Sequence, residues 1–128
     1  MFSLTLMITN KLSLTLVGAG HYAIDLAGPL YRRSRKCTLK SVITPYPNKK
    51  PLKGTALGGL LLFNSIRSWS DSFGISNNDV FDLCIHQYAI VPVLRELAEI
   101  GANKIILPKP IAIKLKSLNE IISLQKKK

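Results

Sequence analysis

Cysteine and histidine are scarce in this chain, since its 128 residues contain two of each. Cys37 and Cys84 lie far apart and show no metal-ligand spacing, and His21 and His86 do not complete a zinc set with them. We therefore expect no metal site. Two distant cysteines also fit a reducing compartment, so we expect the protein to be cytoplasmic.

Long apolar segments are missing as well, because no uncharged apolar stretch is long enough to cross a bilayer. Residues 1–16 have the apolar composition of a signal peptide. They lack a charged first part, however, Lys11 interrupts them, and a glycine turn follows in place of a cleavage site. We therefore expect no membrane partner, and we interpret residues 1–10 as an N-terminal extension and residues 11–128 as one domain.

Acidic residues number only 7, against 18 lysines and arginines, which gives a formal net charge of +11. The acids form no carboxylate pair suited to glycoside hydrolysis. The basic residues cluster at 32–36, 49–53, 114–116 and 126–128, and such a field favours anionic partners. No nucleic-acid-binding motif and no interleaved aromatic residues accompany them. We interpret the charge as a solvated surface that suits a phosphate-bearing cofactor, and we expect no nucleic-acid partner.

Small residues after the first β-type run form the most informative motif of the chain. Residues 12–17 end directly on Gly18-Ala19-Gly20, and Ala23 follows as the third small residue. This pattern predicts the strand, turn and helix start of a dinucleotide-binding unit. Gly18 permits the tight turn, Gly20 lets the backbone approach a pyrophosphate, and Ala23 lets the helix pack on the strand. His21 and Tyr22 would lie at the pyrophosphate edge, although His21 fits an exposed position at the helix start equally well.

Strand-like and helix-like segments alternate along the rest of the chain. A helix at 21–34 contains Pro29, which should remove a hydrogen bond and kink it. We expect further strands at 39–44, 60–63, 80–85 and 104–107, and helices at 66–73, from Pro92 to Gly101, and at 117–125. This alternation predicts an α/β fold, with a Rossmann-like, doubly wound parallel sheet in a single three-layer domain. His86 and Gln87 end a central strand, where such sheets bind ligands, or His86 is simply a hydrogen-bonded residue at the strand end.

Two separated parts of the chain resemble the Gfo/Idh/MocA family, which contains glucose–fructose oxidoreductase and inositol dehydrogenase. They are the glycine turn at 18–23 and the segment 81–107 that leads into Pro108-Lys109-Pro110, where the family carries a Glu-Lys-Pro motif. The resemblance implies a Rossmann domain that binds NADP or NAD, and hydride transfer to or from a sugar-like hydroxyl or carbonyl. It implies that His86 and Gln87 lie beside the nicotinamide ribose. It also implies that Lys109 and Pro110 contact the cofactor, with Lys109 as the catalytic residue.

Three of the chain's departures from the family pattern bear on its function. Pro108 replaces the glutamate of the motif. The second strand ends on Thr44 rather than on an acid, and Lys49 and Lys50 follow, which favours NADP over NAD. The family's substrate domain has no counterpart, so we expect a truncated Rossmann domain, incomplete at its C-terminal end. An NAD(P)-dependent oxidoreductase is the predicted function. A non-catalytic nucleotide-binding module and a basic polyanion-binding scaffold are the alternatives, and the substrate and the oligomeric state stay open.

Overall fold

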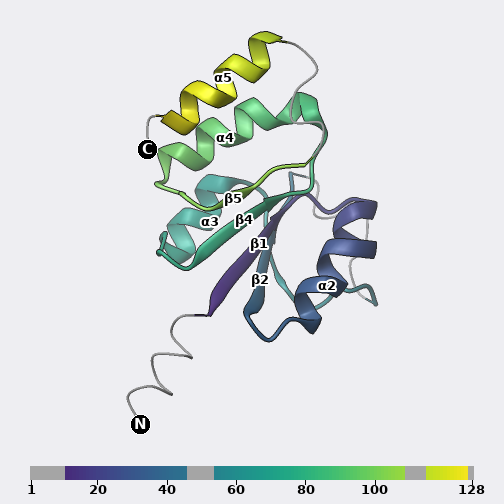
Figure 1. Ribbon diagram of the computed structural model, residues 1–128. Coiled ribbons are helices and arrows are strands. Elements are labelled where there is room, and N and C mark those ends of the chain that lie inside the picture. The colour runs from purple at the N-terminus through teal and green to yellow at the C-terminus, as the bar shows by residue number, and fades with distance from the viewer. Residues whose placement is uncertain (1–10, 46–53, 109–114, 127–128) are drawn as a thin grey trace.

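One parallel β-sheet with helices on both of its faces organises the chain (Figure 1). The computed structural model describes residues 11–45, 54–108 and 115–126. The strand order is β3-β2-β1-β4-β5, and all neighbouring strands run parallel. The strands are β1 (Leu12–Val17), β2 (Cys37–Ile43), β3 (Leu61–Phe63), β4 (Asp79–Leu83) and β5 (Ile105–Ile106). Because the order reverses at β1, the sheet is doubly wound, and the predicted Rossmann-like fold class is confirmed.

Helical segments form the outer layers. They are η1 (Ala23–Ala27), α2 (Gly28–Arg33), α3 (Ile66–Phe73), η2 (Gln87–Ala89), α4 (Ile90–Glu99) and α5 (Leu115–Lys126). In Figure 1, η1 and α2 lie on one side of the sheet, and α4 and α5 stack on the other. The predicted helices and strands are therefore all present, with ends shifted by a few residues. Among the strands, the largest shortening is in β5, which has two residues where four were predicted.

Side chains of the strands fill three buried clusters, of which the smallest contains Leu14, Cys37 and Val80. Leu16 and Val42 face η1 and pack with Ala23, Ala27 and Leu57. Their neighbours in sequence face the opposite layer and join the larger core with α3, α4 and α5. The larger core contains Val17, Ile43, Ile66, Trp69, Phe81, Leu83, Ile90, Leu94, Leu97, Ala102 and Ile121. This alternation fixes which side chains of each strand face which layer of helices. The register of the strands in turn positions the loops at the carboxyl edge of the sheet.

Pro29 is accommodated by a widened helical turn. The five residues before Gly28 form a π-turn, in which the backbone N–H of Gly28 donates to the carbonyl of Ala23, five residues earlier. Such a turn inserts one extra residue into the helix ahead of the proline. Gly28 is needed there, because an added Cβ would lie 2.8 Å from the carbonyl oxygen of Ala23 and 2.8 Å from Cδ2 of Leu57. The sequence predicted a lost hydrogen bond and a kink at Pro29, and the structure shows a changed hydrogen-bond register in the turn before it.

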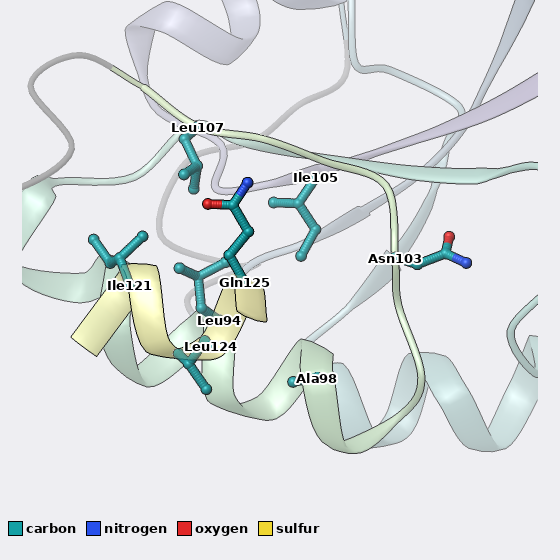
Figure 2. Close-up of a pocket in the computed structure, with 8 residues that line it drawn as sticks. All are labelled: Leu94, Ala98, Asn103, Ile105, Leu107, Ile121, Leu124 and Gln125. Carbon is teal, nitrogen blue, oxygen red and sulfur yellow. The ribbon is translucent and has the colours of Figure 1, made fainter. Parts of the chain in front are cut away.

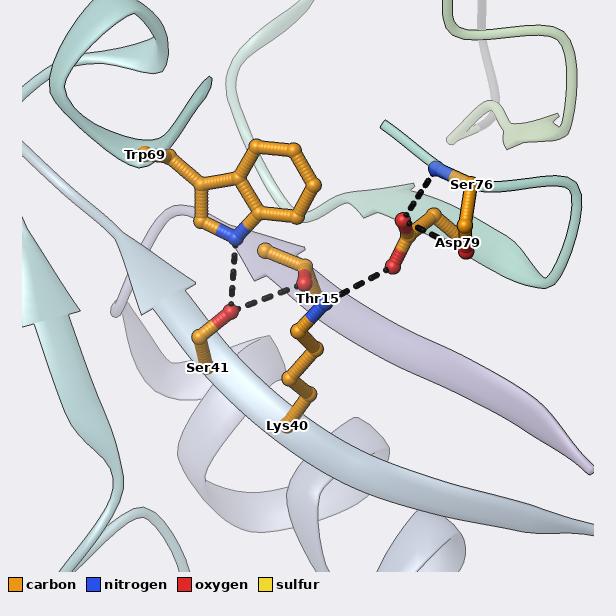
Figure 3. Close-up of polar contacts among 6 residues, drawn as sticks. All are labelled: Thr15, Lys40, Ser41, Trp69, Ser76 and Asp79. Carbon is orange, nitrogen blue, oxygen red and sulfur yellow. Dashed lines mark hydrogen bonds and ion pairs between the residues drawn. The ribbon is translucent and has the colours of Figure 1, made fainter. Parts of the chain in front are cut away.

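A β-bulge in β2 lies at the centre of the sheet. Leu14 pairs with Leu39, but Thr15 pairs with Ser41, so Lys40 is an extra residue in the ladder. The Ser41 hydroxyl lies 2.8 Å from Thr15 Oγ1 and accepts a hydrogen bond of 2.9 Å from Nε1 of Trp69 (Figure 3). This buried polar cluster fixes α3 against the middle strands.

Lys40 and Asp79 form a second part of the same polar region (Figure 3). Lys40 Nζ lies 3.2 Å from Asp79 Oδ1 and 4.1 Å from the ring centroid of Phe73. The other carboxylate oxygen of Asp79 accepts a 2.8 Å hydrogen bond from the backbone N–H of Ser76. Each oxygen of this buried carboxylate therefore has a partner, which removes the penalty of burying an unpaired charge.

Candidate functional site

The turn after β1 is held tightly between two neighbouring strands. The N–H of Gly18 donates to the carbonyl of Ile43 at 2.7 Å, and the N–H of Cys84 donates to the carbonyl of Val17 at 2.8 Å. Gly18 has a φ of +109°, and an added Cβ would lie 2.3 Å from the carbonyl oxygen of Cys84. Both the backbone angle and this contact exclude a side chain. Gly18 therefore has the turn-forming position that the sequence predicted.

Gly20 lies in a different environment, two residues further along. An added Cβ at Gly20 would meet no atom within 4 Å, and the residue is exposed. The helix begins directly after it, and the N–H of Ile24 donates to the carbonyl of Gly20 at 3.0 Å. The first backbone amides of a helix have no acceptor within the helix. Open space over Gly20 beside these amides fits the phosphate groups of a dinucleotide.

The helix start carries the other three predicted residues of this turn. Ala23 is completely buried and packs against Leu16, as predicted for the third small residue. His21 and Tyr22 are exposed, and Nδ1 of His21 lies 3.7 Å from a carboxylate oxygen of Asp25. Because Asp25 brings negative charge to this turn, backbone amides are the main groups here that could hold an anion.

The end of β2 lies next to the glycine turn. Thr44 follows β2, is largely buried, and donates its N–H to the carbonyl of Phe63 at 2.8 Å. Ile43, the residue before it, accepts the hydrogen bond from Gly18. Thr44 is thus at the edge of the sheet where the prediction expected it, while Lys49 and Lys50 lie outside the described residues.

His86 and Gln87 leave β4 on the other side of the glycine turn. A Cβ added at Gly18 would lie 3.1 Å from Cγ2 of Ile85, which shows how close the two loops are. His86 is exposed and Gln87 half-buried, at the start of η2. The structure therefore brings together the two segments that the sequence selected separately. They meet between β1 and β4, the switch point where doubly wound sheets bind ligands.

Lys109 and Pro110, the predicted motif residues, lie outside the described residues. The described chain reaches Pro108 after β5, whose residues pair with β4. The catalytic role of Lys109 and the cofactor contact of Pro110 therefore stay predictions.

Sequence reasoning missed a buried pair beneath the helix that follows the glycine turn. Asp82 is 4% exposed and accepts a hydrogen bond from the Tyr31 hydroxyl. Burial raises the pKa of Asp82, and the bond from Tyr31 opposes this only partly. Burial, with the nearby Asp82 charge, also raises the pKa of Cys84 to about 12. Cys84 is therefore a thiol at neutral pH and unsuited to nucleophilic chemistry. Tyr31 and Asp82 are 51 positions apart in the sequence, so no local sequence pattern could have predicted their contact.

Replacing Asp82 by asparagine should stabilise the protein at neutral pH. The pKa of Asp82 is higher in the folded than in the unfolded chain, so folding favours the protonated carboxyl. The free energy of unfolding then falls as the pH rises through the folded-state pKa. Asparagine keeps an acceptor for Tyr31 and carries no charge. Urea unfolding of both proteins should show an advantage for Asp82→Asn near pH 7 that disappears near pH 4, the ordinary range of aspartate.

Asp79→Asn is the matched control, because Asp79 is equally buried but paired with Lys40. Its loss leaves the lysine without its carboxylate and should cost about 1 kcal/mol or more near pH 7. Equal effects of the two substitutions would contradict the assignment of Asp82 as a buried acid that has no ion-pair partner among the described residues.

A pocket of about 210 Å³ lies beside α4 and α5, and Figure 2 shows the side chains that line it. Aliphatic side chains from α4, β5 and α5 form most of its wall, with Asn103 and Gln125 as the polar members. None of the described residues predicted from the sequence lines it. We therefore place the candidate site at the carboxyl edge of the sheet.

The described part of the chain has neither a metal-binding cluster nor a membrane-spanning helix. Residues 11–45, 54–108 and 115–126 contain no group of three histidine, cysteine or acidic side chains that could hold a metal ion. Within these ranges, too, every helix is too short or too polar to cross a membrane.

Comparison with known sequences gives no relative, since no protein-family model and no curated protein matches the chain. Solved structures do match. D-galactose-1-dehydrogenase from Rhizobium etli is 19% identical with a TM-score of 0.72, and the match covers 92% of this chain and 35% of that one. Myo-inositol 2-dehydrogenase from Lactobacillus plantarum is 14% identical with a TM-score of 0.71, over 91% and 33%.

The WlbA dehydrogenase from Chromobacterium violaceum, solved with NADH and UDP-GlcNAcA, is 22% identical with a TM-score of 0.71. That match covers 92% of this chain and 33% of the other. The chain thus spans about a third of the length of the solved structures that it matches. At these identities the similarity establishes the fold alone, which is Rossmann-like.

Proposed function

We propose that this chain is the nucleotide-binding part of an NAD(P)-dependent oxidoreductase of the Gfo/Idh/MocA type. The reaction would move a hydride to or from a sugar-like hydroxyl or carbonyl. The observation that carries the proposal is the glycine turn, with Gly18 enclosed between two strands and Gly20 open to solvent at the switch point. Structural similarity to dehydrogenases, including one solved with NADH, supports it.

Residues on both sides of the switch point are proposed to contact the dinucleotide. The open backbone at Gly20 and the first helical amides would hold the pyrophosphate, with His21 and Tyr22 at its edge. Thr44 would lie near the adenosine ribose, and His86 and Gln87 near the second ribose. A bound nicotinamide supplies the hydride donor or acceptor, and the protein contributes position and electrostatics.

Lys109 and Pro110 complete the proposed site. Lys109 is the proposed catalytic residue, which would reach the nicotinamide and the substrate. A lysine near a cationic ring has its charged form disfavoured, so its ammonium group could exchange a proton with the reacting oxygen.

A non-catalytic nucleotide-binding module is the second candidate. It is favoured by Pro108, which stands where the resemblance expects the glutamate of the motif. Both candidates require cofactor binding, and they differ in turnover. Turnover of a sugar, an inositol or a related acid would establish the oxidoreductase, whereas both candidates allow background turnover when these 128 residues are assayed alone.

Replacing Gly20 by valine tests cofactor binding directly. The side chain has room in the free protein, because a Cβ at this position meets nothing within 4 Å. It would occupy the space that a pyrophosphate needs, so we expect affinity for NADH or NADPH to fall at least about tenfold. Cofactor fluorescence titration measures this loss, and the melting temperature shows whether the fold is kept.

Thr38→Val provides the control, since Thr38 is exposed on β2 near the opposite edge of the sheet. Its cofactor affinity should equal that of the wild type. Equal affinity in Gly20→Val would instead refute the site.

A further inference from the structure

We propose that His86 presents a fixed Nε2–H donor to an oxygen atom of the ribose–pyrophosphate part of the dinucleotide, and that Tyr88 is the residue that positions its ring. The inference rests on the proposed function and adds to it a defined atom, a defined tautomer and a residue that the sequence did not select. Three features of the loop after β4 carry it.

The first feature is the hydrogen bond that His86 makes within its own loop. Its Nδ1 accepts the backbone N–H of Tyr88 at 3.4 Å and so caps η2. A neutral imidazole has one donor and one acceptor nitrogen. Because Nδ1 is the acceptor, the proton lies on Nε2, on the far side of the ring. The loop thereby selects one tautomer and leaves one donor for another molecule.

The second feature is the contact between the two rings. The centroids of His86 and Tyr88 are 4.7 Å apart, with an interplanar angle of 15°, so the rings are stacked. Both residues are exposed, and Tyr88 retains 71% of its accessible surface. The tyrosine ring therefore adds little to the core. Stacking limits the rotation of the imidazole, so the side chain loses less conformational entropy when a ligand binds.

The third feature is the position of the pair. His86 follows the strand next to the glycine turn, at the switch point of the sheet. The histidine on the other side, His21, has its Nδ1 beside the carboxylate of Asp25. The ribose and phosphate oxygens of a dinucleotide accept hydrogen bonds, so a neutral N–H donor at this place complements them. These observations favour His86 over His21 as the imidazole that binds the ligand.

His86→Asn separates ligand binding from capping. Asparagine is a good cap and can accept the N–H of Tyr88, but none of its atoms reaches the place of Nε2. We expect the variant to keep the wild-type melting temperature and to bind NADH or NADPH about fivefold to tenfold more weakly. Tyr88→Leu should weaken binding to a smaller degree, and Tyr88→Phe should restore wild-type affinity because it keeps the stacked ring.

Nitrogen NMR of the imidazole gives a readout that a purely structural role would not change. The neutral His86 imidazole should show the Nε2–H tautomer, and its Nε2 signal should shift when cofactor is added. If the wild type binds cofactor and His86→Asn binds it equally well, or if the proton is on Nδ1, this inference is overturned and the proposed function stands. If the wild type binds neither cofactor, both are overturned.

Discussion

Gly18→Ala should destabilise the protein by about 3 kcal/mol or more, because the new Cβ has no space and the backbone angle disfavours it. The clash is with a backbone carbonyl oxygen, that of Cys84, at 2.3 Å. A flexible side chain could move away, but this carbonyl belongs to the chain that continues β4. Relief would therefore require the two central strands to separate. Urea unfolding, followed by circular dichroism, measures the loss.

Gly20→Ala is the matched control, since it adds the same atom two residues away. No atom lies within 4 Å of the added Cβ, so the free energy of unfolding should change by no more than about 0.5 kcal/mol. Similar stabilities of the two variants would contradict the described geometry of the turn. The pair thus distinguishes a glycine required by the fold from one that is free for ligand approach.

Assayed alone, these 128 residues should show only background oxidoreductase turnover, even with bound cofactor. Hydride transfer requires the substrate carbon to be held against the nicotinamide, and positioning supplies much of the rate. The chain covers about a third of the dehydrogenases that it resembles. At the described carboxyl edge, His86 and Gln87 are the proposed groups nearest to the ring. Purified protein, NADH or NADPH, and sugars, inositols and related acids provide the assay.

Lys109→Met serves as the comparison in the same assay. If the wild type has only background turnover, this variant should have the same rate. Robust turnover that the substitution abolishes would contradict the expectation, and would make Lys109 catalytic in these 128 residues alone.

The glycine turn and the alternation of strands and helices could be predicted because they depend on local sequence. The helix Ile66–Phe73 illustrates this. Ser65 accepts the N–H of Ser68 at its start, and Gly74, with a φ of +69°, ends it. Both signals lie within one residue of the helix. A parallel sheet predicts that the glycine turn and the His86 loop lie at the same edge, but their adjacency was implied only by the family resemblance, because local sequence does not fix the strand order.

Other features were not predictable, because they depend on contacts between distant segments. The bulge at Lys40 adds a residue to β2, and only its pairing with β1 reveals this. The Tyr31–Asp82 bond joins a helix to a strand that follows much later. The π-turn ahead of Pro29 was not predicted either, and Gly28 within it lies close to Leu57, a residue from a distant part of the chain.

The outer strands of the described sheet bear on how the protein behaves at high concentration. β3 has three residues and β5 has two, and each pairs with one neighbour in the described sheet. Leu61 and Leu62 on β3 are 58% and 40% exposed. A longer edge with such side chains would be a template for strand addition and aggregation. A three-residue edge offers too few hydrogen bonds for a durable intermolecular ladder, and a net charge of +11 adds repulsion between molecules. Short outer strands thus favour colloidal stability in spite of the exposed leucines.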